Sequence, residues 1–308
     1  WSSIPTMNDD GDHVGGVTGV LKSIGYAIRN IQPTRVIVVF DGKGGSQRRK
    51  KRFSGYKSQR ESNKLRVNRQ YADLMNDEDE RESMKRQYVW LNEILDYLPI
   101  QTMIYDGVEA DDIMAYISTQ LLKENEQAVV MSTDKDFLQL VDDTTIVWSP
   151  TKKKLYNKEL VKEEYGIESK NLLLYRVLDG DKSDNIPGVH GCGIKTLVKR
   201  FPEITENKKL SVDDLLSLAE EKKGKIKIYD DILKSKEQIL MNRELMQLDD
   251  PDISGNIKMS ILGRYDEEIN PVNKLNIMKV LVKYKVTDAF GKNFNDWLRD
   301  TFGNIITK

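Results

Sequence analysis

Short apolar runs alternate with helical patterns over the first half of the chain. The runs are too short for helices and predict buried strands, at residues 36–40, 102–105, 128–131 and 145–148. Apolar side chains at helical spacing predict helices between them, at residues 15–30, 86–97 and 113–123. Strands that alternate with helices indicate an α/β fold with a mainly parallel, twisted sheet flanked by helices.

The second half of the chain follows a helical pattern and is rich in charged residues. Predicted helices occupy residues 158–165, 169–178 and most of 211–308. The longest periodic segment in this half is 225–248. No internal repeat and no low-complexity linker is found. We therefore expect an α/β part at residues 1–157 and a helical part at residues 158–308.

Acidic residues follow the ends of three predicted strands. They are Asp41, Glu109, Asp111, Asp112, Asp134 and Asp136. Open α/β sheets place their sites at the carboxyl ends of the strands, so these side chains are expected to meet. Carboxylates brought together raise one another's pKa, and a divalent metal ion is the simplest way to keep them ionised. The alternative interpretation is a set of solvated, acid-rich helix starts.

Basic residues dominate the segment from residue 43 to residue 69, where eleven lysines and arginines face the single acid Glu61. They are Lys43, Arg48, Arg49, Lys50, Lys51, Arg52, Lys57, Arg60, Lys64, Arg66 and Arg69. Phe53 and Tyr56 are interleaved with them. Cations with stacking surfaces suit single-stranded nucleic acid, although a charge run is often only a solvated face. Residues 73–82 then turn acidic and are expected to form the exposed tip of a protruding element.

A glycine-rich segment at residues 178–196 follows one predicted helix and precedes another. Its glycines allow backbone amides to approach a phosphate closely, and Lys195 and Lys199 can add charge. A plain turn between two helices is the alternative. That alternative does not explain why Asp181 and Asp184 precede the glycines.

Composition excludes several other classes of protein. No run approaches the roughly 18 apolar residues that cross a membrane, and nothing at the start of the chain resembles a signal peptide. The single cysteine, Cys192, excludes an internal disulfide and fits a reducing compartment. Only two histidines are present, so a histidine-based zinc site or Ser-His catalysis has little support. We expect a monomer in the cytoplasm.

Four motifs together carry a family resemblance. They read VFDGK at residues 39–43, EADD at 109–112, STDKD at 132–136 and GDKSDN at 180–185. In this order and spacing, the chain resembles the structure-specific 5′-nuclease superfamily. It is similar to bacteriophage flap endonucleases of the ribonuclease H type and to the 5′-nuclease domain of bacterial DNA polymerase I. Residues 148–150 followed by lysines resemble the phage members in particular, and the likeness covers roughly residues 15–250.

The resemblance implies a PIN-like nuclease core with a helical arch at residues 43–97 and a helix–three-turn–helix at about residues 178–201. It implies that two Mg²⁺ ions, for which Mn²⁺ can substitute, are held by Asp41, Glu109 and Asp111 and by Asp134, Asp136 and Asp181, with Asp112 and Asp184 in support. It assigns catalytic roles to Lys57 and Arg60. It implies that Arg48, Arg49, Lys50, Lys51, Arg52 and Tyr56 guide a 5′ single strand. It further implies that Gly188, Gly191, Gly193, Lys195, Thr196 and Lys199 hold the adjoining duplex, with K⁺ bound at the loop.

The implied function is metal-dependent hydrolysis of phosphodiesters where a 5′ single strand meets a duplex. Flap endonuclease, 5′-3′ exonuclease and ribonuclease H activities all belong to this class, and they remove RNA primers or flaps during DNA replication. The implied substrates are branched DNA or RNA–DNA hybrids. A single-strand-binding protein or a sliding clamp is the implied protein partner.

One departure from the family pattern affects the expected rate. The family opens with an apolar strand that ends in an aspartate, and residues 1–13 contain no such strand. Asp9, Asp10 and Asp12 are poor substitutes. We therefore expect a sheet that is one strand short, and slow cleavage by a chain that starts at Trp1.

Two functions from other classes remain as alternatives. The first is a structure-specific DNA-binding protein that has lost catalysis, but binding alone would favour fewer acids beside DNA than the eight found here. The second is an RNA-cleaving nuclease of the PIN type. Such domains are usually much shorter and lack the glycine-rich loop.

Overall fold

The structure is a computed structural model that describes residues 6–58, 77–286, 294–303 and 305–307. The chain forms two compact units. Unit 1 comprises Trp1–Phe40, Asn63–Met103 and Ser260–Lys308, and unit 2 comprises Asp41–Ser62 and Ile104–Met259. The division at residue 157 expected from the sequence, into an α/β part and a helical part, stays a prediction.

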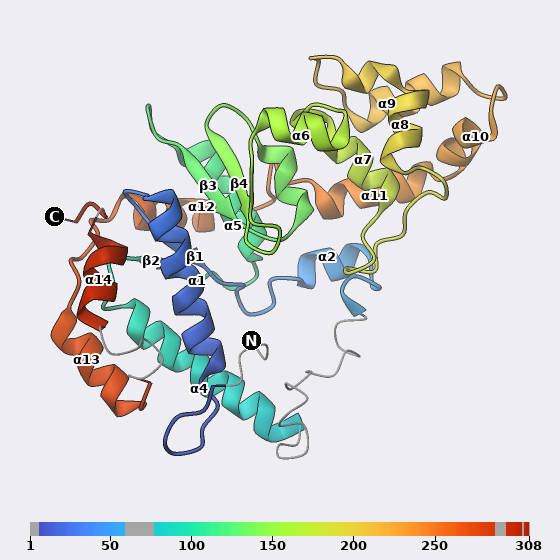
Figure 1. The fold of residues 1–308 in the computed structure, drawn as a ribbon. Helices are drawn as coiled ribbons and strands as arrows, with labels where there is room; N and C mark the ends of the chain where they lie inside the picture. The colour runs from blue at the N-terminus through green and yellow to red at the C-terminus, as the bar shows by residue number, and fades with distance from the viewer. Residues whose placement is uncertain (1–5, 59–76, 287–293, 304, 308) are drawn as a thin grey trace. The chain divides into compact units, whose positions relative to one another are not determined.

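Unit 1 is a helical cluster with one short pair of strands (Figure 1). Its elements are α1 (Gly15–Ile31), β1 (Ile37–Val39), α4 (Asp77–Leu95), β2 (Gln101–Met103), α13 (Lys274–Lys283) and α14 (Phe294–Phe302). Leu21, Leu95, Leu281 and Leu298 come from four different helices and share one buried cluster. Each such leucine contributes about 1.5–3 kcal/mol when it is fully buried.

The strands of unit 1 confirm two of the predicted apolar runs. β1 and β2 are parallel, and Val39 lies opposite Met103. Both strands are shorter than the apolar runs that predicted them. Helix α1 confirms the helix predicted at residues 15–30, and it ends where Gln32 adopts a left-handed conformation.

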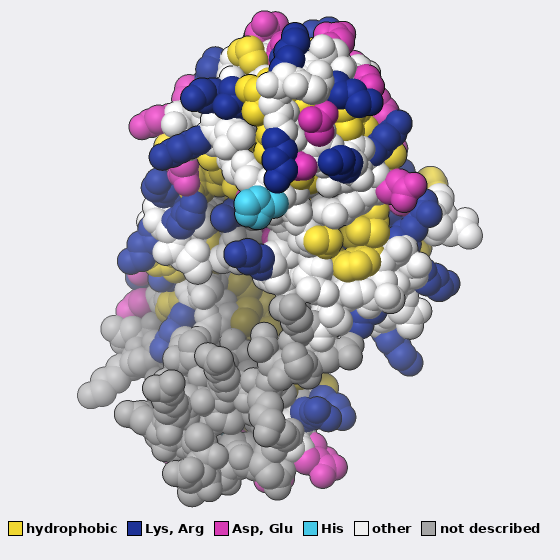
Figure 2. Space-filling view, turned by 90° about the vertical axis from the view of Figure 1, so that its right-hand side faces the viewer, with side chains coloured by type: hydrophobic (Ala, Val, Ile, Leu, Met, Phe, Trp, Pro, Cys, Tyr) yellow, Lys and Arg dark blue, Asp and Glu magenta, His cyan; other side chains and the backbone are white. Residues whose placement is uncertain are grey.

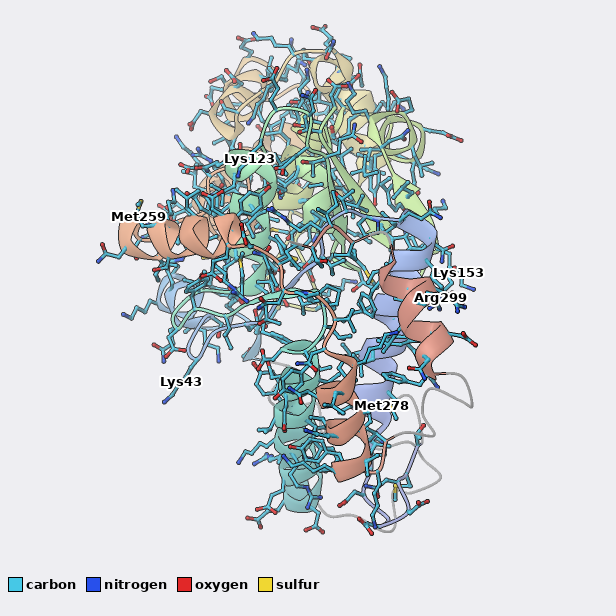
Figure 3. All side chains as sticks on the ribbon, turned by 90° about the vertical axis from the view of Figure 1, so that its left-hand side faces the viewer. Lys43, Lys123, Lys153, Met259, Met278 and Arg299 are labelled. Atoms are coloured by element: carbon cyan, nitrogen blue, oxygen red, sulfur yellow. The ribbon has the colours of Figure 1, made fainter. Side chains whose placement is uncertain are left out.

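Unit 2 contains a three-stranded sheet surrounded by short helices (Figure 1). Its elements up to the sheet's last strand are α2 (Gln47–Arg52), α5 (Ala110–Tyr116), a π-helical turn (Ile117–Leu121), β3 (Ala128–Met131), a 3₁₀ turn (Lys135–Leu140), β4 (Thr145–Ser149) and β5 (Lys154–Tyr156). The later elements are α6 (Lys158–Tyr165), 3₁₀ turns at Ser169–Asn171 and Pro202–Thr205, α7 (Leu172–Asp179), α8 (Ile194–Arg200), α9 (Val212–Glu221), α10 (Lys227–Lys234) and α11 (Lys236–Met246). Helix α12 (Gly255–Asp266) spans the boundary between the sequence ranges of the two units, and its Met259 is largely exposed (Figure 3).

The sheet of unit 2 has one parallel and one antiparallel pairing. β3 and β4 are parallel, with Met131 opposite Trp148, as expected from two buried apolar runs. The antiparallel strand β5 was not predicted from the sequence, because two of its three residues are exposed and only Tyr156 carries a buried side chain. A charged edge strand of this length leaves no hydrophobic pattern to detect.

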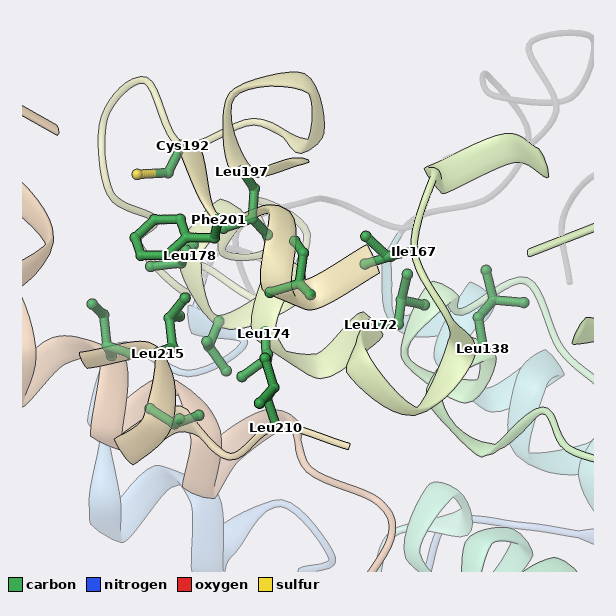
Figure 4. Close-up of a cluster of buried hydrophobic side chains, with 14 of the residues drawn as sticks. Leu138, Ile167, Leu172, Leu174, Leu178, Cys192, Leu197, Phe201, Leu210 and Leu215 are labelled. Atoms are coloured by element: carbon green, nitrogen blue, oxygen red, sulfur yellow. The ribbon is translucent and has the colours of Figure 1, made fainter. Parts of the chain in front are cut away.

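The largest buried cluster of unit 2 joins the helices to the sheet (Figure 4). Leu174 and Leu178 of α7 lie in this cluster with Leu197 of α8 and Phe201 just after that helix. Because both α7 and α8 are fixed by this packing, the loop between them is held at both ends.

One long segment differs from the helix pattern predicted for it. The periodic segment 225–248 is two helices, α10 and α11, that are interrupted at Ser235. Apolar spacing continues across the break, so periodicity alone could not reveal it. Residues 59–76, which carry part of the predicted arch and the first four residues of the predicted acidic tip, lie outside the described residues. The rest of the tip, residues 77–82, is the first part of helix α4. In the part of the chain that the structure describes, no helix is long and apolar enough to cross a membrane.

Candidate active site

The turn after β1 brings Asp41 to the start of α5. The Asp41 carboxylate accepts a hydrogen bond of 2.8 Å from the backbone N–H of Ala110. Gly42 is required beside it, because an added Cβ would lie 1.7 Å from the carbonyl oxygen of Tyr105. Lys43 follows on an exposed edge and points away from the chain (Figure 3). Asp41 and the EADD motif are therefore joined at one helix terminus.

Arg49 is buried beneath this helix terminus. Its guanidinium binds both oxygens of Asp112, at 2.9 and 2.7 Å, and it also contacts Glu109. Its Nε donates to the carbonyl of Leu245 at 2.9 Å. Burial alone would raise the pKa of Glu109, but the charges of Arg49 and Lys57 outweigh it and hold that pKa below the ordinary value. Arg49 thus holds two acids in place from inside the fold.

Lys57 and Tyr56 reach the same glutamate from the segment after α2. The Lys57 ammonium pairs with Glu109, and the Tyr56 hydroxyl lies 3.5 Å from its Oε1 atom. The Tyr56 side chain is buried and packs near Ile186 and Leu245. The ring is therefore part of the core at this point, and its exposed area is too small to stack a base.

Two backbone contacts connect Lys57 to the loop after α7. The Lys57 N–H donates to the carbonyl of Asp184 at 2.9 Å, and the Asn185 amide donates to the carbonyl of Gly55 at 2.9 Å. Both Lys57 and Asn185 are in the left-handed region, at φ 56° and 59°. Such conformations are uncommon away from glycine and cluster at functional sites. These contacts place Lys57 beside the GDKSDN motif.

Arg176 is the second buried arginine of the site. It donates to Asp136 at 2.5 Å and to Asp181 at 2.7 Å, and its side chain is 4% exposed. Asp134 lies one turn away and accepts a hydrogen bond of 2.8 Å from the backbone N–H of Asp136. The acids at the end of β3 and in the GDKSDN motif therefore meet around one guanidinium.

Asp111 lies among the other acids. Burial, followed by the negative charges of Asp134 and Glu109, raises the pKa of Asp111 to about 7, against the opposing charges of Lys57 and Arg49. Burial is the larger cause, and the two charge effects show that Asp134 and Glu109 lie near enough to Asp111 to repel its negative charge. The strands, helix α5 and the α7 loop thus assemble one electrostatically coupled set of acids.

The match to a family profile covers more than half of the chain. The profile, described as the 5′-3′ exonuclease N-terminal resolvase-like domain, matches residues 2–166. The chain belongs to this family. It is therefore a nuclease, and its activity is that of a 5′-nuclease.

Named relatives agree with the family. The 5′-3′ exonuclease of Buchnera aphidicola subsp. Acyrthosiphon pisum is 31% identical over 263 residues, which cover 84% of this chain and 85% of that protein. DNA polymerase I of Bacillus subtilis is 30% identical over 93% of this chain, and the chain spans only 30% of that polymerase. A bacteriophage T5 protein co-crystallised with metal ions has a TM-score of 0.60, at 21% identity and 92% coverage of both chains. This structural likeness confirms the fold class, an α/β 5′-nuclease core.

The predicted site residues of this 5′-nuclease separate into groups. Glu109, Asp111, Asp112, Asp134, Asp136 and Asp181 are brought together by the contacts and charges described above. Asp184 contributes its carbonyl to the Lys57 contact, and Arg60 lies outside the described residues. Among the described residues no three acids are placed so that they could hold a metal ion as they stand, and several of their oxygens are paired with Arg49, Lys57 and Arg176.

The basic residues of α2 do not all face solvent. Arg48 pairs with Asp112 at 3.2 Å and with Asp252 at 2.9 Å, whereas Arg52 forms an exposed pair with Glu244 at 2.7 Å. Lys51 is exposed and Lys50 is half-buried. Arg49 is fully turned inward, so within this family member its role is to position acids.

The glycine-rich loop contains glycines of two kinds. An added Cβ at Gly188 would lie 2.1 Å from the carbonyl oxygen of Asp179, so this glycine is required by the loop's own packing. At Gly193 nothing lies within 4 Å of an added Cβ, and the backbone is open there. Gly191 has a φ of 80°, which favours glycine by conformation. Lys195 and Lys199 are exposed on α8, and Thr196 is half-buried.

Two positioning residues were not predicted from the sequence. Arg176 is the only charge in an otherwise apolar stretch at residues 172–178, a pattern that signals a buried cation with an acidic partner. Asn242 of α11 is completely buried and donates to the carbonyls of Val177 and Pro187, both at 2.8 Å. Nothing in the sequence distinguishes Asn242 from other polar residues of the helix.

Proposed function

We propose that this 5′-nuclease hydrolyses phosphodiesters at junctions between a 5′ single strand and a duplex, using divalent metal ions held by the acids of unit 2. The observation that carries the proposal is the coupled set formed by Glu109, Asp111 and Asp134, with Lys57 at its edge. Like charges kept together in a partly buried site are stabilised by cations. No observation favours the alternative of a DNA-binding protein without catalysis.

The donor chemistry fits Mg²⁺, which prefers carboxylate oxygens and retains several waters. We assign Asp41, Glu109 and Asp111 to one ion and Asp134, Asp136 and Asp181 to a second. Asp112 and Asp184 support them, and Asp112 suits this role because Arg49 already binds both of its oxygens. When bound, two such ions supply a hydroxide nucleophile and stabilise the attacking and leaving oxygens. A flap endonuclease variant of bacteriophage T5 has been crystallised with DNA and metal ions, which supports a metal-dependent reaction on DNA.

Lys57 offsets negative charge on the reacting phosphate in this proposal. Its ammonium is held by Glu109 and is largely buried, so it is positioned before a substrate arrives. A phosphate that enters the site can replace Glu109 as its partner. Arg60 is assigned a similar role from the resemblance alone.

The nucleic acid is held on both sides of the acids. We assign the single strand to the exposed bases of α2 and the duplex to the loop at residues 188–193 and to α8. In this division, residues 1–157 carry most of the metal-binding acids, and residues 158–308 bind the duplex and add Asp181 and Asp184 to the site. K⁺ at the loop, RNA–DNA hybrids as substrates, and a single-strand-binding protein or clamp as partner are further expectations from the resemblance.

A labelled flap substrate tests the proposed reaction. With Mg²⁺, the chain is expected to cut near the junction and leave product ends that map within a few nucleotides of it. Without divalent ions, or with excess chelator, no product is expected because the acids cannot activate water unaided. Binding without cleavage at every Mg²⁺ concentration would establish the catalytically impaired alternative.

Replacing Gly193 by alanine tests the duplex assignment. The added methyl meets open space, so the melting temperature should fall only slightly, by the small preference for glycine over alanine at the N-cap of α8. Affinity for the duplex arm should fall about 10-fold, since a phosphate can no longer approach the backbone. Gly188→Ala is the contrasting variant, and it should unfold at lower temperature because of its clash with Asp179. Equal binding by wild type and Gly193→Ala would remove this position from the interface.

A further inference from the structure

A lysine-rich turn joins α9 to α10 in unit 2. Residues 222–227 read KKGKIK, and the side chains of Lys223, Lys225 and Lys227 are exposed. Figure 2 looks onto the end of unit 2 that carries α8, α9 and α10, where lysine and arginine side chains are numerous. The proposed function does not use this turn.

The turn is anchored to the end of α8. Lys222 donates to the carbonyl of Arg200 at 3.3 Å and pairs with Glu203 at 2.8 Å. The Tyr229 hydroxyl donates to the same Arg200 carbonyl at 3.1 Å, and its ring packs edge-on against Phe201. Two donors on one carbonyl fix both ends of the turn, so the lysines are presented from a defined backbone.

The same turn lies beside the loop assigned to the duplex. A Cβ built on Gly191 would lie 3.7 Å from the Cδ1 atom of Ile228, in the first turn of α10. One residue further along, burial and then the charge of Asp231 raise the pKa of Cys192 to about 12. α10 therefore packs along the loop, and the lysines before it extend the loop's surface.

Acids flank this turn at Glu220, Glu221, Asp230 and Asp231, but only two of its four lysines are paired with described residues. Lys225 and Lys227 form no ion pair with any residue that the structure describes. The nearby acid Glu220 is paired with Lys223, and Asp230 accepts from the Gly224 backbone at 3.2 Å. Unpaired lysines hold exchangeable counterions, which a phosphate backbone releases on binding.

We propose that this turn is a second phosphate-binding element, which contacts the duplex arm of the substrate beyond the stretch held by the loop at residues 188–193. The inference rests on the proposed function. A duplex suits the turn better than a single strand because the turn has no exposed aromatic ring on which a base could stack, and Tyr229 is buried. Affinity should therefore grow with the length of the duplex arm.

The double variant Lys225→Ala/Lys227→Ala in the full chain tests this inference. Binding is measured against salt concentration for flap substrates with duplex arms from about 6 to about 20 base pairs, which differ in the number of phosphates within reach. On long arms the slope of log affinity against log salt should fall by about 1.8, which is 0.9 for each lost phosphate contact. On the shortest arms the variant should match wild type, and its melting temperature should be unchanged. Lys274→Ala/Lys279→Ala, on exposed positions of α13 in unit 1, removes the same charge from another element and should leave the slope as it is.

The results of this experiment distinguish a failure of the proposed role of the turn from a failure of the proposed nuclease function. Wild-type slopes for the Lys225/Lys227 variant on every arm, or an equal loss on short and long arms, would overturn the inference while flap binding by wild type stands. Failure of wild type to bind any flap substrate would instead refute the proposed function, and the inference with it.

Discussion

Replacing Asp134 by asparagine should lower the rate of flap cleavage by more than about 100-fold, since partners outside the ligand set already account for about 10–100-fold in metal sites. The change removes one negative charge from the coupled acids. Asparagine keeps the carbonyl oxygen that accepts from the Asp136 N–H, so the local turn is retained. Flap binding should be unchanged or tighter, because a charge that repels phosphate is lost.

Single-turnover cleavage and flap binding, each measured across a Mg²⁺ titration, distinguish these effects. Asp142→Asn is a matched control. Asp142 likewise accepts from backbone N–H groups, of Thr144 and Thr145 at 2.8 Å, but in an exposed loop before β4. This variant should cleave like wild type. Unaltered cleavage by Asp134→Asn would exclude Asp134 from the metal site.

Replacing Arg49 by methionine should reduce the free energy of unfolding by about 3–5 kcal/mol, the cost of breaking a buried ion pair from one side. The side chains of Glu109 and Asp112 are each only 3% exposed, so both carboxylates would lose a cation that water cannot replace. Added Mg²⁺ should recover part of the loss if these acids bind it, because a ligand of the native state stabilises that state.

Chemical denaturation measures the stability of Arg49→Met beside that of Arg52→Met, a control variant in the same helix. The Arg52 pair with Glu244 is 65% and 48% exposed, and such surface pairs contribute about 0–1 kcal/mol. The midpoint for Arg52→Met should therefore lie close to wild type. Similar losses in the two variants would show that Arg49 does not support the acids.

The sequence predicted the structure best where a short pattern of side chains has one physical explanation, such as burial of a strand. The four apolar residues at 128–131 predicted β3 at its observed bounds, because a buried parallel strand needs apolar side chains on both faces. The acids after the strands were predicted to meet at the edge of one sheet. The described strands form two sheets instead, and the acids are held by the buried Arg49 and Arg176. Family likeness then extended the set to Asp181.

The sequence could not predict which side chains in a run of similar residues are buried and which face solvent. Residues 48–52 are five consecutive bases, and only the fold decides that Arg49 turns toward Asp112 while Lys51 faces solvent. The same limit applies to the glycines at 188 and 193, which are alike in sequence and differ only in what surrounds them. Asn242 donates a hydrogen bond to the carbonyl of Val177, which is 65 residues away in the sequence. The spacing of apolar residues carries no information on a contact at that separation.

The contacts that join Lys57 to Asp184 and Gly55 to Asn185 make two recognition steps interdependent. One segment belongs to the part assigned to the single strand, and the other leads into the loop assigned to the duplex. With this arrangement, the site would respond only when the single strand and the duplex are bound at the same time. We expect a substrate that engages only one segment to leave Lys57 paired with Glu109. Selectivity for junctions over plain duplex or free single strands would thus arise from the backbone linkage, without any contact that reads the branch point itself.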